Sequence, residues 1–330
     1  FRAGSPIVEA GLTLTMGLPK RCLYLPDARP SCGRIRRIAL GFPPVLTESD
    51  ELKGRLLDPG DASALIPPVA PEDYKHRRGV CAVFAGSRGT TGAAVLAATA
   101  AARSTAGMVR IFADEEAYPV LASQCRSVMV AERSEAVPDL AGHSALLVGP
   151  GWGRASSRRE DLRRLVETGI PGVLDADGIN VLSDMRAEES QLPTLGGVWV
   201  LTPHAGELAR LSGRSGREVL ADPFQVTIKT ARELDAVVCL KSHVTIIASP
   251  DGRYAVVDGM NPSMGTGGAG DVLAGMIAGL LARGGAAFDA AAAGCSIHDA
   301  LGKRLFAERG FFLAEDLVEE VSREMARFLA

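Results

Sequence analysis

Aromatic residues, clustered cysteines and an excess of one charge are scarce or absent in this sequence. Aromatic residues make up 5% of the chain and form no ladder with Lys or Arg, which argues against a stacking platform for single-stranded nucleic acid. The formal net charge of −3 gives no reason to expect nucleic acid or an anionic membrane as a partner. The six cysteines contain no CxxC pair, so we expect reduced thiols rather than a metal cluster or a disulfide framework.

Long hydrophobic runs are absent as well. The longest uncharged apolar segment, residues 272–282, is shorter than the roughly 20 residues that span a bilayer. It contains Gly275 and Gly279 in a GxxxG spacing, which in a short helix beside charged residues predicts close packing against another helix or strand. No basic start followed by an apolar run marks a signal peptide. We therefore expect a soluble, cytoplasmic protein.

From about residue 79, short β-branched runs alternate with alanine-rich helical runs. This alternation implies right-handed crossovers and a largely parallel sheet covered by helices on both faces. Strands are expected at 80–85, 108–112, 145–148, 172–175, 198–201, 236–240, 244–248 and 254–257. Helices are expected at 91–105, 115–124, 157–167, 206–211, 223–234, 268–281, 286–306 and 314–328. The short connection between the last two strands predicts a hairpin at one sheet edge.

The residues before 79 do not follow this alternation. Segment 51–78 has the composition of a linker, with several prolines and a charged end. Residues 1–50 contain a strand candidate at 12–15 but too little apolar chain for a core of their own. We interpret the chain as the tail of a preceding domain whose beginning is missing (1–50), a linker (51–78) and one main domain (79–330).

The most informative stretch is the glycine-rich loop Asn261-Pro-Ser-Met-Gly-Thr-Gly-Gly-Ala-Gly-Asp271, which leads into an apolar helix. Helix N-termini present free N–H donors and a partial positive charge to anions. Asp271 would lie beside this anion site, where it could take a proton from a hydroxyl that attacks phosphorus. A plain turn with a capping Asp is the alternative. No Gly-Lys-Ser/Thr follows a glycine run, so the loop is no Walker A motif.

Other polar motifs follow predicted strands and should therefore meet at one edge of the sheet, where such folds bind ligands. They are Gly86-Ser-Arg-Gly-Thr-Thr-Gly-Ala93, Val148-Gly-Pro-Gly-Trp-Gly153, Leu174-Asp-Ala-Asp-Gly-Ile-Asn180, Leu201-Thr-Pro-His-Ala-Gly-Glu207 and Lys241-Ser-His-Val-Thr245. Each motif also has a structural explanation: tight turns for the glycines, a helix cap for Asp177 and a solvated surface for Lys241. Their shared position at one edge is what favours a site.

Read together, these motifs resemble the NAD(P)H-hydrate dehydratase family of the ribokinase-like superfamily. The likeness runs in order over about residues 75–330, and the motifs at 201–207 and 266–271 are its most specific parts. Vitamin kinases of the superfamily usually have Asn where this chain has His204, which favours a dehydratase. The resemblance implies a ribokinase-like three-layer αβα sandwich with a largely parallel central sheet and an antiparallel edge hairpin.

Two further features refine the resemblance. Residues 1–50, above all Thr13-Leu-Thr-Met-Gly-Leu-Pro-Lys20, look like the C-terminal tail of an NAD(P)H-hydrate epimerase domain, so we expect no epimerase activity in this chain. The family's nucleotide segment usually begins Lys-Gly, whereas this chain has Lys241-Ser242-His243. A side chain in place of Gly could crowd the nucleotide or alter the choice between ADP and ATP.

The activity implied by the resemblance is dehydration of the S epimer of NAD(P)H hydrate, with ADP or ATP as phosphate donor and Mg²⁺ as cofactor. Asp271 would be the base, and the amides of Gly267, Gly268, Ala269 and Gly270 would form the anion hole. The family's pattern places Ala93, Gly153, His204 and Asp271 on the hydrate, and Lys241, Ser242, His243, Val244, Thr245 and Gly270 on the nucleotide. The sequence names no metal ligand and is compatible with a homo-oligomer.

Two alternatives stay open on the sequence alone. A small-molecule kinase for a vitamin precursor would share the Gly270-Asp271 loop but release a stable phosphorylated product. A nucleotide-sensing module would keep the pocket without turnover, an alternative that the altered Lys-Ser-His segment leaves open.

Overall fold

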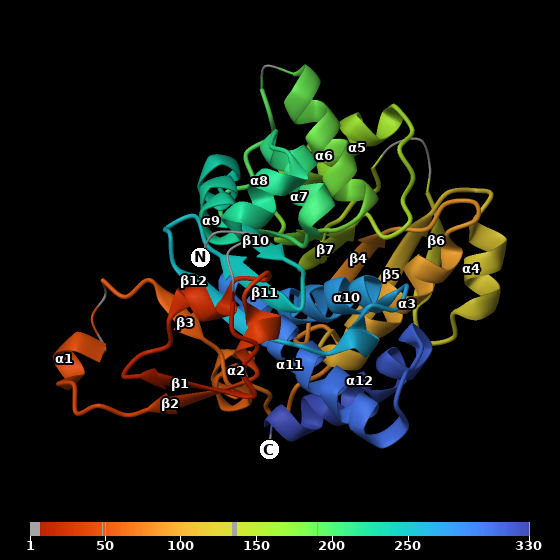
Figure 1. The fold of residues 1–330 in the computed structure, drawn as a ribbon. Coiled ribbons are helices and arrows are strands. Elements are labelled where there is room, and N and C mark those ends of the chain that lie inside the picture. The colour runs from red at the N-terminus through yellow and green to blue at the C-terminus, as the bar shows by residue number, and fades with distance from the viewer. Residues whose placement is uncertain (1–6, 48, 50, 134–136, 190, 330) are drawn as a thin grey trace.

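The computed structural model describes residues 7–47, 49, 51–133, 137–189 and 191–329. A ten-stranded sheet lies between two layers of helices, and a separate two-stranded sheet lies near the N-terminus (Figure 1). The strands of the large sheet follow the order β3-β12-β11-β10-β9-β8-β7-β4-β5-β6. This arrangement confirms the predicted α/β class and the largely parallel sheet covered on both faces.

The strands are β1 Leu12–Met16, β2 Arg34–Ile38, β3 Gly54–Leu56, β4 Val80–Phe84, β5 Met108–Ala113, β6 Met129–Glu132, β7 Ala145–Val148, β8 Gly172–Leu174, β9 Trp199–Leu201, β10 Val237–Leu240, β11 Val244–Ala248 and β12 Tyr254–Asp258. The α-helices are α1 Pro44–Thr47, α2 Pro59–Leu65, α3 Thr91–Ser104, α4 Tyr118–Gln124, α5 Ser157–Glu167, α6 Asp177–Glu188, α7 Ala205–Ser212, α8 Gly216–Ala221, α9 Pro223–Leu234, α10 Ala269–Ala282, α11 Ala287–Arg309 and α12 Ala314–Leu329. Short 3₁₀ turns are η1 Arg21–Tyr24, η2 Arg29–Cys32 and η3 Pro262–Met264.

The core has two halves, one on each face of the sheet. Alternate residues of β4 belong to different halves: Cys81 and Val83 pack under α3 and α10, whereas Ala82 and Phe84 pack under the helices on the opposite face. Helices α5 to α9 cover this second face, and α10, α11 and α12 lie on the first (Figure 1). A strand buried on both faces reads as a continuous apolar run, which explains the sequence Val-Cys-Ala-Val-Phe.

The predicted antiparallel hairpin is present, but it is not the outermost pair of strands. Strand β11 pairs with β10 and β12 in antiparallel fashion, and β3 adds to the far side of β12 in parallel. Segment 51–78, expected to be a linker, thus supplies an edge strand and also helix α2, whose Ala62 lies in the core. The misleading signal was Asp58-Pro-Gly60: Asp58 forms a capping box and Pro59 occupies the first turn of α2, where its missing N–H costs nothing.

Helix α10 packs so closely on α3 that its GxxxG glycines have no room for side chains. A Cβ on Gly275 would lie 2.1 Å from the Ala97 carbonyl oxygen, and one on Gly279 would lie 1.9 Å from Ser104 Oγ. The predicted helix–helix packing is confirmed. No helix in the described part of the chain is both long and apolar enough to cross a membrane.

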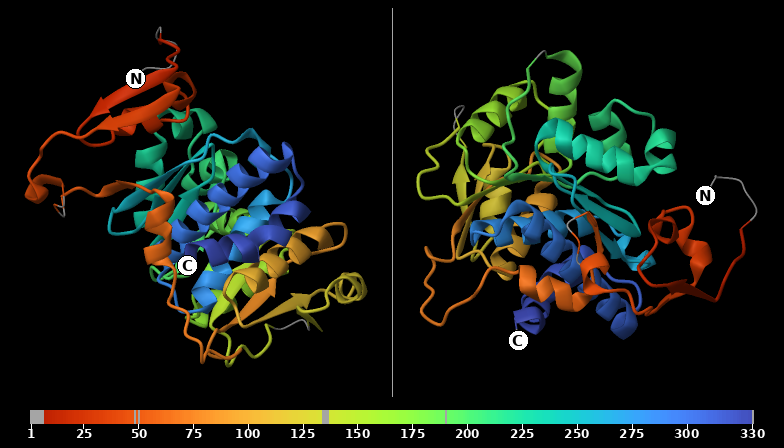
Figure 2. Two further views of the ribbon diagram at one scale, coloured as in Figure 1. Left: turned by 90° about the horizontal axis from the view of Figure 1, so that it is seen from below. Right: turned by 90° about the vertical axis from the view of Figure 1, so that its left-hand side faces the viewer.

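Outside segment 51–78, helices α1, α6 and α8 and strands β2 and β6 were not predicted from the sequence. Helix α6 begins at Asp177, directly after a residue with an unusual backbone, Ala176, whose φ is 46°. At the N-terminus, the strand candidate at 12–15 is confirmed as part of β1, which pairs in parallel with β2. This small sheet projects from one side of the main body (Figure 2).

Candidate active site

The motifs singled out in the sequence meet at the carboxyl edge of the parallel strands. Gly153 N donates to Asp177 Oδ2 at 2.8 Å, which joins the loops after β7 and β8. Thr90 Oγ1 donates to the Gly151 carbonyl at 2.8 Å, which joins the loops after β4 and β7. His204 pairs with Lys241 in an isolated parallel bridge between the ends of β9 and β10. The expectation of one shared edge is therefore confirmed.

The glycine-rich loop turns into helix α10 through Gly268, whose φ of 92° favours glycine. A Cβ on Gly268 would lie 2.7 Å from Leu96 Cδ1 and 2.8 Å from Ala314 Cβ, so helices α3 and α12 hold the loop. The Ala269 amide donates to the Thr266 carbonyl at 3.3 Å. Within the described residues no backbone hydrogen bond outside regular elements uses the amides of Gly267, Gly268 or Gly270, as is typical of N–H groups at the start of a helix.

Asp271 lies in the first turn of α10, next to these amides. Its pKa is raised from 3.8 to about 7: burial is the largest cause, the Asp175 carboxylate adds to it, and the Lys241 ammonium partly offsets both. A carboxyl group with a pKa near 7 exchanges protons readily at neutral pH, which suits a general base. The glycine-rich motif predicted Asp271 as a site residue, whereas its raised pKa could not be predicted because it depends on burial in the folded chain.

Lys241 and Asp175 form a buried ion pair beside Asp271. Lys241 Nζ lies 2.6 Å from Asp175 Oδ1, which also accepts a hydrogen bond from Thr202 Oγ1 at 2.6 Å. Burial lowers the pKa of Lys241, but the carboxylates of Asp175, Glu207 and Asp271 outweigh it, and the net shift is upward. Lys241 is therefore a fixed cation, and a Cβ on Gly270 would approach its Nζ to 3.3 Å.

His204 is the N-cap of helix α7. Its Nδ1 accepts hydrogen bonds from Gly206 N at 3.0 Å and Glu207 N at 3.3 Å, and Glu207 Oε2 accepts from His204 N at 2.8 Å. With Nδ1 as acceptor, the neutral ring carries its proton on Nε2. Asn, which vitamin kinases usually have at this position, is also a good N-cap. Capping helix α7 is therefore compatible with a second role of His204 in ligand binding.

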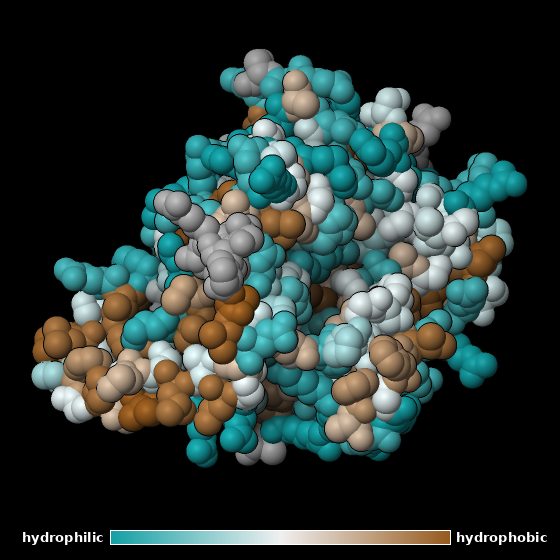
Figure 3. Space-filling view, in the orientation of Figure 1, coloured by the Kyte–Doolittle hydropathy of each residue, from teal (hydrophilic) through white to brown (hydrophobic). Residues whose placement is uncertain are grey.

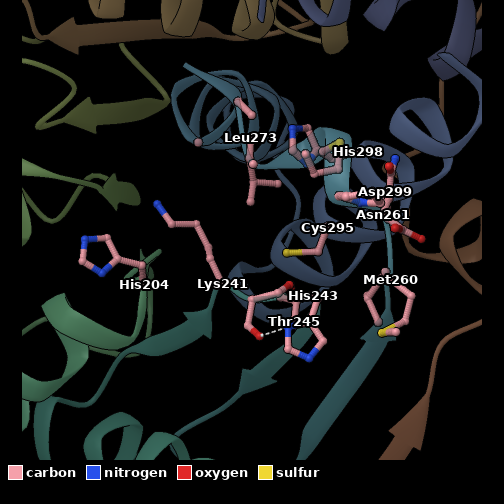
Figure 4. Close-up of a pocket in the computed structure, with 18 residues that line it drawn as sticks. His204, Lys241, His243, Thr245, Met260, Asn261, Leu273, Cys295, His298 and Asp299 are labelled. Atoms are coloured by element: carbon pink, nitrogen blue, oxygen red, sulfur yellow. Dashed lines mark hydrogen bonds between the residues drawn. The ribbon is translucent and has the colours of Figure 1, made fainter. Parts of the chain in front are cut away.

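A pocket of about 520 Å³ opens between Lys241 and helix α11. Figure 4 shows His204 and Lys241 on one side, His298, Asp299 and Asn261 on the other, and Leu273 between them. Of the predicted nucleotide residues, Lys241, Ser242, His243, Thr245 and Gly270 line it. Val244 points to the opposite face of β11 and is fully buried in the core. Ala93, Gly153 and Asp271 are not part of its lining.

The opposite wall of the pocket was not assigned from the sequence. It comes from the loop 259–265 and from Cys295, His298 and Asp299 of α11. Burial lowers the pKa of His298 to about 4, so this ring is neutral at physiological pH. The spacing of these three residues, i, i+3 and i+4, places them on one helix face, which is the signal that could have been used.

Most of the chain matches one protein family. A sequence model of NAD(P)H-hydrate dehydratase matches residues 81–323. The chain belongs to the NAD(P)H-hydrate dehydratase family. It is 35% identical over 342 residues to the bifunctional NAD(P)H-hydrate repair enzyme of Salinibacter ruber, an alignment that covers 97% of this chain and 62% of that protein. The chain spans about three fifths of the length of the curated relatives it matches first.

Solved structures agree with this family and with the fold. An ADP/ATP-dependent NAD(P)H-hydrate dehydratase from Bacillus subtilis, co-crystallised with ATP and Mg²⁺, matches with a TM-score of 0.75 and 26% identity over 83% of this chain and 98% of that chain. A ribokinase-like superfamily protein from Enterococcus faecalis matches with a TM-score of 0.72 and 24% identity over 84% of this chain and 97% of the other. The fold of this family member is ribokinase-like.

Proposed function

We propose that this chain dehydrates the S epimer of NAD(P)H hydrate with ADP or ATP as phosphate donor, a reaction of metabolite repair. The observation that carries the proposal is Asp271: it has a pKa near 7, lies in the first turn of α10 and is flanked by free amides and by Lys241. Family membership supplies the substrate class.

The chemistry follows from the groups at this site. Asp271 takes the proton of the hydrate's hydroxyl while the oxygen attacks the terminal phosphorus and the bond to the nucleotide breaks. Hydroxide leaves a ring poorly, whereas the phosphate ester formed here leaves well. The lone pair of the ring nitrogen then expels phosphate, and loss of a proton from the neighbouring ring carbon restores NAD(P)H. ADP would give AMP, and ATP would give ADP.

The pocket of about 520 Å³ is the proposed nucleotide site. Its size lies within the range of small-molecule sites, and its lining includes Val257, Met260 and Leu273, apolar side chains that could contact a base. The amides of Gly267, Gly268 and Gly270 are placed to stabilise charge on the transferred group. We propose that Ala93, Gly153 and His204 lie on the hydrate side, since the loops that carry Gly153 and His204 lie at the same edge. His204 also lines the nucleotide pocket beside Lys241, so it would lie where the two substrates meet.

Mg²⁺ fits this site as a partner of the nucleotide. The described residues contain no group of three or more His, Cys, Asp or Glu side chains that could hold a metal. Mg²⁺ in such enzymes usually has one or two carboxylate ligands and otherwise uses phosphate oxygens and water. Asp271 is the carboxylate beside the anion site, and the ion would neutralise phosphate charge.

Residues 1–50 are proposed to be the tail of an epimerase-like domain. Their small parallel sheet exposes Leu12, Leu14, Met16 and Ile38, which are 42–58% accessible. These side chains belong to the apolar area over β1, β2 and α1 (Figure 3). Two strands with an exposed apolar face are marginal by themselves, which supports a role as part of a larger domain.

We also propose that the chain forms a homo-oligomer, and light scattering would test this by measuring its mass in solution.

The deciding experiment mixes the protein with NADH hydrate, Mg²⁺ and either ADP or ATP, and follows NADH absorbance together with phosphate release. A nucleotide-dependent rise in both signals is expected, and it identifies the donor. A stable phosphorylated product without NADH would instead indicate a vitamin-type kinase. Nucleotide binding without any product would indicate a sensing module.

A further inference from the structure

A segment of the N-terminal region, residues 21–33, is anchored on the main domain beside the proposed nucleotide pocket. We call these residues the N-terminal clamp. Tyr24 of the clamp is 5% exposed and belongs to the core half under α5 to α9. Arg21 lies over the ring of Phe224 of α9, with 5.2 Å between guanidinium carbon and ring centre. In Figure 1 the red clamp lies beside the cyan strands β11 and β12. The clamp is thus a fixed part of the pocket's surroundings.

The strongest link is a bidentate pair between Arg29 and Asp258. Arg29 Nε donates to Asp258 Oδ1 at 2.7 Å and Nη2 donates to Oδ2 at 2.8 Å. Its Nη1 donates to the Gly33 carbonyl at 2.7 Å, so the guanidinium also closes the clamp on itself. Arg29 is 8% exposed and its contact with Asp258 is bidentate, so the geometry of the pair is more closely defined than that of a surface ion pair.

The second link reaches a residue that lines the pocket. His243 Nε2 lies 2.9 Å from the Pro26 carbonyl oxygen. A carbonyl only accepts, so the ring donates from Nε2. His243 belongs to the Lys-Ser-His segment in which this chain departs from the Lys-Gly of its family. Its side chain therefore connects the clamp with the first residues of β11.

Both links hold the same end of the β11–β12 hairpin. Asp258 pairs with Val244 in the hairpin register, and Met260 N donates to the His243 carbonyl at 2.9 Å. Lys303 Nζ donates to the Asp258 carbonyl at 2.7 Å and to Asp299 Oδ2 at 2.8 Å, and Asp299 lines the pocket. The chain from Asp258 onwards is the loop 259–265 that forms the pocket's far wall.

We propose that the N-terminal clamp positions the nucleotide pocket through Arg29, so that seating of the clamp and binding of ADP or ATP strengthen each other. The proposal rests on the proposed function only in taking this pocket as the nucleotide site. Arg29 is a positioning residue: it touches Asp258, and Asp258 leads directly into the pocket wall. A preceding domain attached to the clamp would thereby influence nucleotide affinity, and by reciprocity nucleotide would influence that domain.

The first test measures ADP and Mg²⁺-ATP binding by calorimetry for Arg29→Met, Asp258→Asn and the double variant. We expect each single change to weaken nucleotide binding about 2- to 30-fold, the range of coupling through residues that do not contact a ligand. The double variant should be no worse than the poorer single one, since both changes remove the same contact. Arg29→Lys, which keeps the charge without the bidentate geometry, should be intermediate.

A matched control separates positioning from general loss of stability. Arg133 forms a buried pair with Asp161 at 2.5 Å on the opposite end of the sheet. Arg133→Met should lower the unfolding temperature and leave ADP binding unchanged. In steady-state assays Arg29→Met should raise KM for the nucleotide, whereas KM for the hydrate and kcat stay within about twofold.

Amide hydrogen exchange of the wild-type chain gives a second test that needs no substitution. ADP should slow exchange in the loop 259–265 and also in the clamp, because coupling is reciprocal. Protection of the loop alone, or unchanged ADP affinity in a folded Arg29→Met variant, overturns the proposal. Weaker ADP binding in Arg29→Met supports it even if the wild type shows no dehydratase activity. A wild type that binds neither ADP nor Mg²⁺-ATP overturns both this proposal and the assignment of the pocket.

Discussion

Replacing Asp271 with Asn should abolish activity and at the same time stabilise the protein at neutral and alkaline pH. A pKa raised from 3.8 to about 7 means that the folded state opposes ionisation of this carboxyl group. The difference between the two protonation states corresponds to about 4 kcal/mol. Asp271 is not fully enclosed, and Asn also loses the attraction of Lys241, so we expect a gain of about 1–3 kcal/mol at pH 8.

The sign of the pH dependence follows from the direction of the pKa shift. Between pH 4 and 7 the folded state holds a proton on Asp271 that the unfolded chain has released. The free energy of unfolding of the wild type therefore falls as the pH rises through this window, and the full penalty is present above pH 7. Near pH 4 both Asp271 and its Asn replacement are neutral, so the gain should nearly vanish there.

Urea denaturation of both proteins at pH 4.5, 6, 7 and 8 measures this difference directly. The activity assay supplies the other half: the wild type should lose kcat/KM below about pH 7 as Asp271 becomes protonated, and the Asn variant should lose at least about 100-fold at every pH. A stability gain that is the same at pH 4.5 and 8 would show that burial of the charge is not the cause. An active Asn variant would refute the role of Asp271 as base.

The remaining predictions concern its neighbours. Gly270→Ala places a Cβ 3.3 Å from Lys241 Nζ, so the flexible ammonium must move. We therefore expect kcat/KM for the nucleotide to fall by up to about 100-fold, with little change in the urea midpoint. Lys241→Met leaves the Asp175 carboxylate buried without its cation and should cost roughly 2–3 kcal/mol by urea titration, with Lys241→Met/Asp175→Asn recovering part of it. His204→Ala should lose about 1 kcal/mol because the cap of α7 is gone, whereas His204→Asn should keep the stability of the wild type.

The sequence predicted the sheet and the edge at which the candidate motifs meet because both depend on local patterns. Strands buried on two faces appear as short apolar runs, and glycines and polar residues mark their carboxyl ends, as at Gly149 and Asp175. Local composition gave a wrong prediction where pairing with a distant strand determines the structure. Segment 51–78 has the composition of a linker, yet Gly54–Leu56 becomes a strand because the open edge of β12 accepts it.

The pKa of Asp271, the far wall of the pocket and the contact between His243 and Pro26 could not be predicted from the sequence, because each depends on residues that are distant in the chain. The pKa of Asp271 depends on burial and on the charge of Asp175, which is distant in the chain. The pocket wall of Cys295, His298 and Asp299 depends on how α11 packs against the loop 259–265. The link from His243 to Pro26 joins residues 217 positions apart, and no periodicity reports such a contact.

The ion pair between Asp175 and Lys241 places a positive charge beside Asp271. A base and a polyphosphate repel each other, so a bare Asp271 would meet an approaching nucleotide with its negative charge uncompensated. Lys241, whose pKa is held upward by the Asp175, Glu207 and Asp271 carboxylates, stays protonated and supplies a fixed positive charge. Asp175 is itself fixed by Thr202, so the ammonium is held at 2.6 Å from a rigid anchor and near Gly270. In the proposed mechanism the cation could then stabilise negative charge at the proposed anion hole with little movement, as electrostatic stabilisation of a transferred group requires.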